Sequence, residues 1–399
     1  MGLSRRDFLK GAAVTAGALV VPAALAPRAR AVGGEPVLVS IILRGGADGL
    51  NLVVPHADPR YYELRPNVAV PMGSALDIDG FFGLHPALAP LLPIYQARRL
   101  AVVHAVGSHD SSRSHFDAQD FLERAAPGDF SVQDGWLNRY LQAIGSDASL
   151  AAITVGNAKA LSLAGAAPSL AFWSVADLRL AGRFETQRRA ALEQIYQSVQ
   201  ATLLGRSAAE FFDGIDQLAA IHNDSSVPYP DSPFSQALRD VAALIRADLG
   251  VRVVVLNLDG WDHHESGSEA TGFMAKTLAE GLAAFDQDLG ASAGRTLVVT
   301  TTEFGRTVEE NGSLGTEHGH GSVSFVMGGA IHGGRVLLRD GQWPGLEKAQ
   351  RFEEQDLAVT TDFRDLFAEL LHRHMGLSAV SQILPGHSVS ASRYPGLYA

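Results

Sequence analysis

Cysteine is absent from the 399-residue sequence. Its absence excludes disulfide bonds, thiolate metal sites, a cysteine nucleophile and a lipoprotein anchor. Acidic residues outnumber basic ones, 43 against 32, and the net charge of −11 argues against a nucleic-acid partner. Hydrophobic content of 46% and charged content of 19% are those of a folded globule. The length fits one large α/β domain or two to three smaller ones.

A long apolar run is also missing. The stretch at residues 11–25 is too short and too rich in Gly and Ala for a secure membrane span, so we expect no permanent span. It follows a basic segment and precedes Ala29-Arg30-Ala31, which has the form of a signal-peptidase site. Residues 4–10, SRRDFLK, resemble the twin-arginine signal.

These features predict a twin-arginine signal peptide at residues 1–31. The expected partner is the twin-arginine export machinery, and the expected location is the periplasm or the exterior. Cleavage would remove more basic than acidic residues, so the mature chain, residues 32–399, would be more acidic than the whole. Because this route resembles one used by proteins that fold before export, it also favours a bound metal or cofactor.

Short apolar, β-branched runs predict five buried strands, at residues 36–43, 100–106, 251–258, 296–301 and 322–327. Such near-continuous runs are typical of a mostly parallel sheet covered on both faces. Helical patterns lie between the strands, at residues 86–98, 116–124, 186–203, 208–222, 234–248, 271–289 and 361–375. The alternation predicts a single α/β domain over residues 32–399, with a helical insertion around 182–247.

Residues suited to chemistry lie at the predicted strand ends, where open α/β sheets bind their ligands. Carboxylate and imidazole groups are the ligands of Zn, Mn and Ca sites, and without cysteine the chain offers no softer ligand. We therefore expect one or two divalent ions, possible ligands being Asp48, Asp262, His264, Glu303, His318 and His320. The alternative to metal binding is a structural role, in which these residues cap a helix or turn or are polar groups of surface loops.

A hydroxyl group stands at the start of a predicted helix. Ser114 precedes the helix that begins near His115, where free backbone N–H groups favour an anion. Ser114 is the candidate nucleophile, with Ser112 as the substitute and a simple N-cap as the structural alternative. Arg113 and Arg306 are candidates to hold an anion by two-point hydrogen bonds, and Arg44 either does the same or fixes its turn.

These motifs resemble an exported bacterial family, domain of unknown function 1501, of the alkaline phosphatase and sulfatase superfamily. The similar segments are LRGGADGLNLVVPHADPRYYELRP (43–66), FFGLHPALAPLLPIYQ (81–96), SRSHFDAQDFLER (112–124), LDGWDHH (258–264), TTEFGRT (301–307), NGSLGTEHGHG (311–321) and TTDFRDLFAELL (360–371). The resemblance implies an alkaline-phosphatase-like core. It also implies metal ligands at Asp48, Asp262, His264 and His318, and a hydroxyl nucleophile at Ser114.

The sequence departs from the superfamily pattern at one ligand. Phosphatase and mutase members carry T-A-D-H-G, whereas this chain has TTEFG at residues 301–305. Glu303 can replace the aspartate, but Phe304 cannot replace the histidine as a ligand. The departure implies one metal ion instead of two, a substitute ligand at His320 or His115, or a degenerate site.

The resemblance implies an exported metal-dependent hydrolase of phosphate or sulfate esters. Its nucleophile would be a hydroxyl or a metal-bound water, and its substrate a small anionic ester or a surface polymer. The alternative is a non-catalytic exported protein with a degenerate phosphatase-like fold that binds a metal or a surface polymer. An oxidoreductase role has no support from a dinucleotide or haem motif.

Overall fold

The computed structural model describes residues 34–398, except residues 149, 157, 176–184 and most of 203–224. Residues Glu35–Ala399 form one compact unit. The predicted signal peptide and its cleavage site lie outside the described residues. So does most of the helix predicted at 208–222, whereas α7 (Glu185–Gln197) covers much of the one predicted at 186–203.

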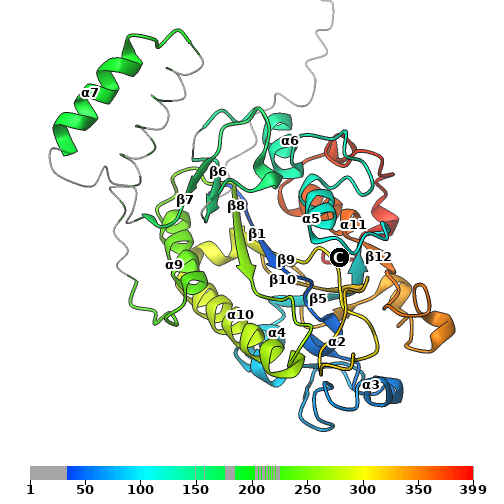
Figure 1. The fold of residues 1–399 in the computed structure, drawn as a ribbon. Helices are drawn as coiled ribbons and strands as arrows, with labels where there is room; N and C mark the ends of the chain where they lie inside the picture. The colour runs from blue at the N-terminus through cyan, green and yellow to red at the C-terminus, as the bar shows by residue number, and fades with distance from the viewer. Residues whose placement is uncertain are drawn as a thin grey trace, which may run out of the picture. The chain divides into compact units, whose positions relative to one another are not determined.

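A nine-stranded mixed sheet forms the centre of this unit (Figure 1). Its order is β11 (Val336–Leu337), β5 (Leu100–Gly107), β10 (Ser322–Gly328), β9 (Thr296–Thr301), β1 (Val37–Arg44), β8 (Val253–Asp259), β6 (Ala152–Val155) and β7 (Leu170–Phe172), with β12 (Thr361–Asp362) paired to β5. β10 is antiparallel to β5 and β9, and the other pairs are parallel. The five predicted strands and the mostly parallel sheet are therefore confirmed.

The direction of β10 decides where the polar loops meet. Because β10 runs against its neighbours, its first residue lies at the edge where β1, β5, β8 and β9 end. The loop that enters β10 therefore shares that edge with the loops that leave the parallel strands. The sequence segments with candidate ligands thus meet along one side of the sheet.

Strand β1 shows how both faces of the sheet are buried. Alternate side chains of a strand point to opposite faces. Val37, Val39, Ile41 and Leu43 belong to one hydrophobic cluster, whereas Leu38 and Ile42 belong to another. A strand that is buried on both faces needs apolar residues at odd and at even positions, so its sequence is a nearly continuous apolar run. This is why β1 could be predicted from the sequence.

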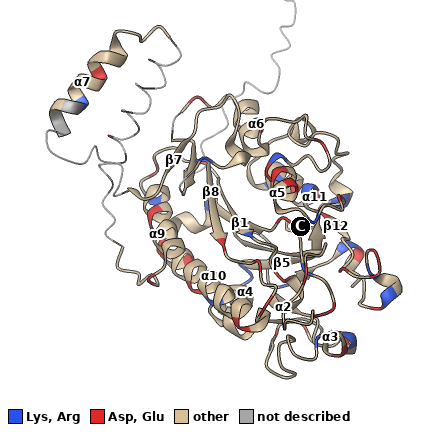
Figure 2. Cartoon of the chain, in the orientation of Figure 1, with Lys and Arg blue, Asp and Glu red and all other residues tan. Residues whose placement is uncertain are grey.

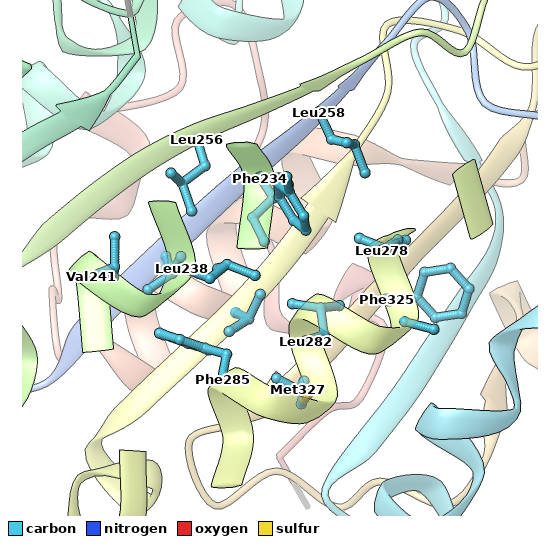
Figure 3. Packing of buried hydrophobic residues seen from close by; sticks show 14 of the residues in the cluster. Phe234, Leu238, Val241, Leu256, Leu258, Leu278, Leu282, Phe285, Phe325 and Met327 are labelled. Atoms are coloured by element: carbon cyan, nitrogen blue, oxygen red, sulfur yellow. The ribbon is translucent and has the colours of Figure 1, made fainter. Parts of the chain in front are cut away.

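Helices cover both faces. One face packs against η2 (Pro86–Leu91), α4 (Leu92–Gln96), α9 (Pro233–Arg246) and α10 (Gly267–Leu289), and Figure 3 shows side chains of α9 and α10 meeting those of β8 and β10. The other face packs against α6 (Trp136–Ala143) and α11 (Phe363–Glu369). Helix α9, which the prediction assigned to the insertion, thus contributes Phe234, Leu238 and Val241 to the core. It begins at the N-cap Ser232, followed by proline.

Several short elements had no clear sequence signal. They include β6, β7 and α6, and a three-stranded sheet of β2 (Val53–Val54), β4 (Gly83–Leu84) and β3 (Leu76–Asp77). The remaining helical segments are α2 (Gly49–Leu52), α3 (Pro59–Leu64), α5 (His115–Arg124), η3 (Leu161–Leu163), η5 (Gly290–Arg295), η6 (Arg339–Gly341), η7 (Lys348–Gln350), η8 (Leu370–His374), η9 (Val380–Gln382) and η10 (Ala391–Arg393).

Charged residues lie mainly on the helices and in the loops, while the strands are largely free of them (Figure 2). In the part of the chain that is described, we find no helix with the length and apolarity needed to cross a membrane.

Candidate metal centre

The turn after β1 places Asp48 in an internal ion pair. Asp48 caps α2, where its Oδ1 accepts from Asn51 N at 3.4 Å. Its Oδ2 accepts from Arg65 Nη1 at 2.7 Å, and the two side chains are 7% and 0% exposed. The predicted ligand Asp48 therefore has a cation supplied by the chain itself.

The side chain of Arg306 joins three loops at this edge. Its guanidinium donates to the carbonyl oxygens of Gly45, Gly46, Trp261 and Thr316, and its Nη2 donates to Asp262 Oδ1 at 2.7 Å. The side chain is 1% exposed. In this conformation Arg306 fixes the loops and does not present its donors to a substrate anion.

Three imidazoles converge on Asp262. The Nε2 atoms of His264 and His318 lie 2.9 Å and 3.1 Å from Asp262 Oδ1. His115 Nε2 lies 3.4 Å from Asp262 Oδ2. Among the described residues, the ligand atoms of His115, Asp262 and His318 form a group within 4.8 Å of one another that could hold a metal ion. His264 adjoins this group, since its Nε2 is 3.0 Å from His318 Nε2.

The opposite nitrogen of each imidazole is held by an oxygen acceptor. The Nδ1 atoms of His115, His264 and His318 lie 2.9 Å from Glu303 Oε1, 2.8 Å from Glu317 Oε2 and 2.9 Å from the Arg113 carbonyl. Because a carbonyl or ionised carboxylate only accepts, Nδ1 must donate in each contact. A neutral imidazole has a single N–H, so each Nε2 then presents a lone pair.

This orientation fits a bound cation. The Nε2 lone pairs of His115 and His318 and the carboxylate of Asp262 face one another, with His264 beside them. His115 Nε2 is buried without a hydrogen bond to any described residue. Two nitrogens bound to one Zn²⁺ at about 2.0–2.1 Å in tetrahedral geometry lie about 3.4 Å apart. The Nε2 atoms of His264 and His318 lie 3.0 Å apart, and His115 Nε2 lies 3.4 Å from Asp262 Oδ2. Both distances are close to that value. Metal-binding histidines commonly donate their other N–H to a carboxylate or carbonyl, and the three imidazoles described above make such contacts.

The charged groups around the cluster shift its pKa values. Partial burial alone would raise the pKa of Asp262, but the hydrogen bond from Arg306 and the contact with His318 outweigh it and hold that pKa well below its ordinary value. The hydrogen bond to Glu303 raises the pKa of His115. Burial lowers the pKa of His318. Asp262 is therefore ionised at neutral pH and available as a ligand.

Glu303 lies behind His115, away from the converging Nε2 atoms. Its fully buried carboxylate accepts from Gly45 N at 2.8 Å and Gln119 Nε2 at 2.8 Å, in addition to His115 Nδ1. Burial alone would raise its pKa, but the hydrogen bonds from His115 and Gln119 lower it overall. The predicted ligand Glu303 is thus placed to position His115. The neighbouring ring of Phe304 packs 4.9 Å from that of His115 and 4.7 Å from that of His318.

The other predicted residues lie around the cluster. His320 stacks on Phe352 with 4.0 Å between ring centroids, and burial lowers its pKa to about 4. Arg113 donates to Glu353 and Asp356 at 2.8 and 2.6 Å, and Arg44 donates to Glu123 and Gln119. Ser114 is half-buried and caps α5, its Oγ accepting from Asp117 N at 3.5 Å.

The structure therefore brings together three predicted ligands, Asp262, His264 and His318, and separates Asp48, Glu303 and His320 from them. The sequence predicted His115 only as a substitute ligand. In the structure His115 is the first residue of α5, directly after Ser114, and it belongs to the cluster. No sequence pattern pointed to a role of Arg65 at the site.

The solved structures similar to this chain include phosphatase- and sulfatase-like proteins. The C-terminal periplasmic domain of EcEptC from Escherichia coli has 10% identity and a TM-score of 0.43, covering 91% of this chain and 87% of that one. The sulfatase PsFucS1 from Pseudoalteromonas sp. has 12% identity and a TM-score of 0.37, covering 86% and 68%. The alkaline phosphatase of the Antarctic bacterium TAB5 has 9% identity and a TM-score of 0.30, covering 74% and 92%.

The sequence of the chain matches the models of an export signal and of one protein family. No curated protein matches the chain in sequence. Residues 2–22 match the model of the twin-arginine translocation pathway signal sequence, so the chain carries a signal for export to the periplasm or beyond. Residues 36–385 match the model of the family described as "Protein of unknown function (DUF1501)", and the chain belongs to that family.

Proposed function

We propose that the protein is an exported metal-dependent hydrolase of phosphate or sulfate esters. The observation that carries the proposal is the orientation of His115, His264 and His318, whose Nε2 atoms face Asp262 while their Nδ1 atoms are held by oxygen acceptors. These four residues would hold one divalent ion. Three imidazoles and one carboxylate favour Zn or Mn over Ca, which prefers oxygen ligands.

A hydroxyl group precedes one residue of this cluster in the sequence. A divalent ion bound there would stabilise negative charge that develops on an ester oxygen. Ser114 precedes His115, and the first N–H groups of α5 have no partner within the helix. They favour a negatively charged group near Ser114. Ser114 Oγ would attack the phosphorus or sulfur atom, and the ester alcohol would leave with the proton that the hydroxyl loses. Water would then release phosphate or sulfate and restore Ser114, while Asp262, His115, His264 and His318 keep their positions.

One observation favours the non-catalytic alternative. Arg44, Arg113 and Arg306 already donate to carboxylate, amide or carbonyl oxygens of the protein. An ester hydrolase would bind its anion with the ion and the start of α5, or would have to release one of these contacts. A metal-binding protein that does not turn over a substrate has no anion to bind, so its arginines can keep all of these contacts.

Metal analysis of the purified mature protein tests the proposed site. The protein should carry about one divalent ion per chain, and His318→Ala should lose it. His332→Ala is the matched control, because this exposed histidine does not belong to the cluster. A metal-free wild-type protein that folds normally would refute the proposed site.

A hydrolysis assay distinguishes the proposed hydrolase from a metal-binding protein without catalytic activity. Aryl phosphates and aryl sulfates should be screened with Zn, Mn and Ca, and at least one should be hydrolysed by the metal-loaded protein. Ser114→Ala should abolish turnover and keep the ion. Full activity in this variant would remove Ser114 as the nucleophile. A metal-loaded protein that hydrolyses none of the substrates would support the non-catalytic alternative.

A further inference from the structure

A small cavity lies between the start of α2, the start of α10 and the loop that connects β8 to α10. Its volume of about 10 Å³ is that of a site for one water molecule. Asp48 and Asn51 line it from α2, Gly267 and Thr271 from α10, and Trp261 and His263 from the loop. The cavity is therefore formed where three separate parts of the chain meet.

Successive residues of the loop from β8 to α10 have different surroundings. Asp262 belongs to the metal cluster, and His264 adjoins it. In contrast, Trp261 and His263 line the cavity. Two histidines that are adjacent in the sequence thus lie in different sites, and the metal cluster gives His263 no role.

Two ring nitrogens of the residues that line this cavity lack partners. Trp261 Nε1 and His263 Nε2 are buried and form no hydrogen bond with any described residue. Trp261 as a whole is 1% exposed, so bulk solvent does not reach its indole N–H. Buried polar groups are nearly always paired, either with the protein or with ordered water. The two nitrogens therefore indicate a bound group in the cavity.

Charged residues at the cavity place the imidazole of His263 near Asp48. Burial and the charge of Arg306 lower the pKa of His263, whereas the charge of Asp48 acts to raise it. Asp48 and Arg306 both line the cavity. The guanidinium of Arg306 already donates to backbone carbonyls and to Asp262, so it offers little to a further ligand.

The chemistry of the cavity narrows the choice of occupant. An indole N–H only donates, so Trp261 Nε1 would oppose a cation. The Asp48 carboxylate would oppose an anion, and chloride is larger than the water molecule for which the cavity has room. An apolar molecule would leave both ring nitrogens unpaired.

We propose that one internal water molecule binds in this cavity and bridges Trp261 Nε1 and His263 Nε2. Its oxygen accepts from the indole N–H. Because water both donates and accepts, it pairs with His263 Nε2 in either neutral tautomer of the imidazole. A further hydrogen of the water can be donated to the Asp48 carboxylate, which agrees with the roughly three hydrogen bonds that internal waters make.

The bridging water stabilises the loop that carries Asp262. Trp261 and His263 stand on either side of Asp262 in the sequence, and the water ties both of their side chains to the cavity between α2 and α10. Arg306 Nη2 donates to the carbonyl of Trp261 as well, at 3.0 Å. The water is bound by protein atoms alone, so this proposal does not rest on the proposed function.

A high-resolution crystal structure of the mature protein tests the site directly. Density for one water should lie about 2.7–3.2 Å from both Trp261 Nε1 and His263 Nε2. A second crystal, soaked in bromide, distinguishes an anion, because bromide is located by its anomalous scattering. Absence of the water density, or an anomalous bromide peak at this position, would overturn the proposal.

Nuclear magnetic resonance of the metal-free protein tests the same water in solution. The indole N–H of Trp261, assigned with Trp261→Phe, should show a cross-peak to a long-lived water. Trp343 is the internal control, because its Nε1 donates to Asp58 Oδ2 at 3.0 Å and should show none. A wild-type spectrum without the Trp261 cross-peak would contradict the proposal even if no variant folds.

A histidine variant tests the bridge. His263→Phe keeps an aromatic ring but removes one partner of the water, so the Trp261 cross-peak should be lost. His332→Phe is the matched control at an exposed histidine and should leave the cross-peak unchanged. An unchanged cross-peak in folded His263→Phe would show that His263 does not hold the water.

Discussion

Asp48 and Asp262 follow adjacent parallel strands, β1 and β8, but they are surrounded very differently. Asp48 is 6% exposed and bound to the buried Arg65. The side chain of Asp262 is 46% exposed; its Oδ1 accepts from Arg306, and its Oδ2 faces His115 Nε2. A buried carboxylate needs a compensating cation, and Asp48 has one within the chain. At Asp262 three imidazole lone pairs remain uncompensated, which is the arrangement that an external cation would complete.

The largest expected effect is the loss of the metal from Asp262→Asn. The neutral amide is a weak ligand and removes the charge on which the imidazoles converge. Metal content should fall from about one ion per chain to nearly none, measured by elemental analysis after dialysis. Asp48→Asn should retain its ion. If Asp48→Asn also lost the ion, the contrast between the two carboxylates would not hold.

A second prediction concerns the ion pair of Asp48. Arg65→Met leaves Asp48 buried without a charge partner, which should lower the free energy of unfolding by about 3–5 kcal/mol. Denaturant titration measures this change. Arg60→Met is the matched control, because Arg60 pairs with Glu63 and Glu347 at the exposed surface and should matter much less. Equal effects of the two substitutions would contradict the internal role of Arg65.

The third prediction addresses the positioning of His115. Glu303→Gln keeps an acceptor for His115 Nδ1 but removes its charge, so metal affinity should fall about 10- to 100-fold. Competition with a chelator measures the affinity. Glu310 also accepts several hydrogen bonds, from Asn67 and Val68, and Glu310→Gln should leave the affinity unchanged. A Glu303→Gln variant that lost the ion altogether would indicate that Glu303 is itself a ligand.

The smallest expected effect compares the cluster with a core histidine whose nitrogens are both bonded. His104 Nε2 donates to the Val53 carbonyl, Nδ1 accepts from Ala105 N, and burial lowers its pKa to about 4. The unfolded chain, with an ordinary pKa of about 6.5, therefore binds the proton more readily.

The stability that neutral His104 contributes is thus complete above pH 6.5 and is lost as the pH falls toward 4. Between pH 7 and 5 the loss is about 2 kcal/mol. Unfolding of the metal-free protein at several pH values should show this slope, and His104→Gln should flatten it. Identical slopes would show that other groups cause the acid sensitivity.

The sequence predicted the elements whose signal is local. Near-continuous apolar runs identified β1, β5, β8, β9 and β10, because a strand buried on both faces is apolar at most of its positions. In contrast, β6 and β7 have four and three residues, too few for a pattern. The helix at α10 was predicted from its periodicity, although the structure begins it four residues earlier.

The site could be predicted only in part, because its decisive contacts join distant residues. The loops with Asp262, His264 and His318 could be placed at one edge of the sheet from the strand ends alone. The sequence could not show that Arg65 neutralises Asp48, or that Arg306 donates to three turns at once. Nor could it show that Glu303 contacts His115 across 188 residues of chain.

The oxygen acceptors that hold His115, His264 and His318 also bear on when the proposed ion could enter. Because these acceptors belong to the protein, they would orient each imidazole with or without an ion. The folded chain would then be able to acquire the proposed ion after export as well as before it. In such a pocket affinity follows the Irving–Williams order, so Mn and Fe bind more weakly than the later metals and are loaded only where those are scarce. The identity of the ion would then be set by the supply of metals in the compartment where loading occurs.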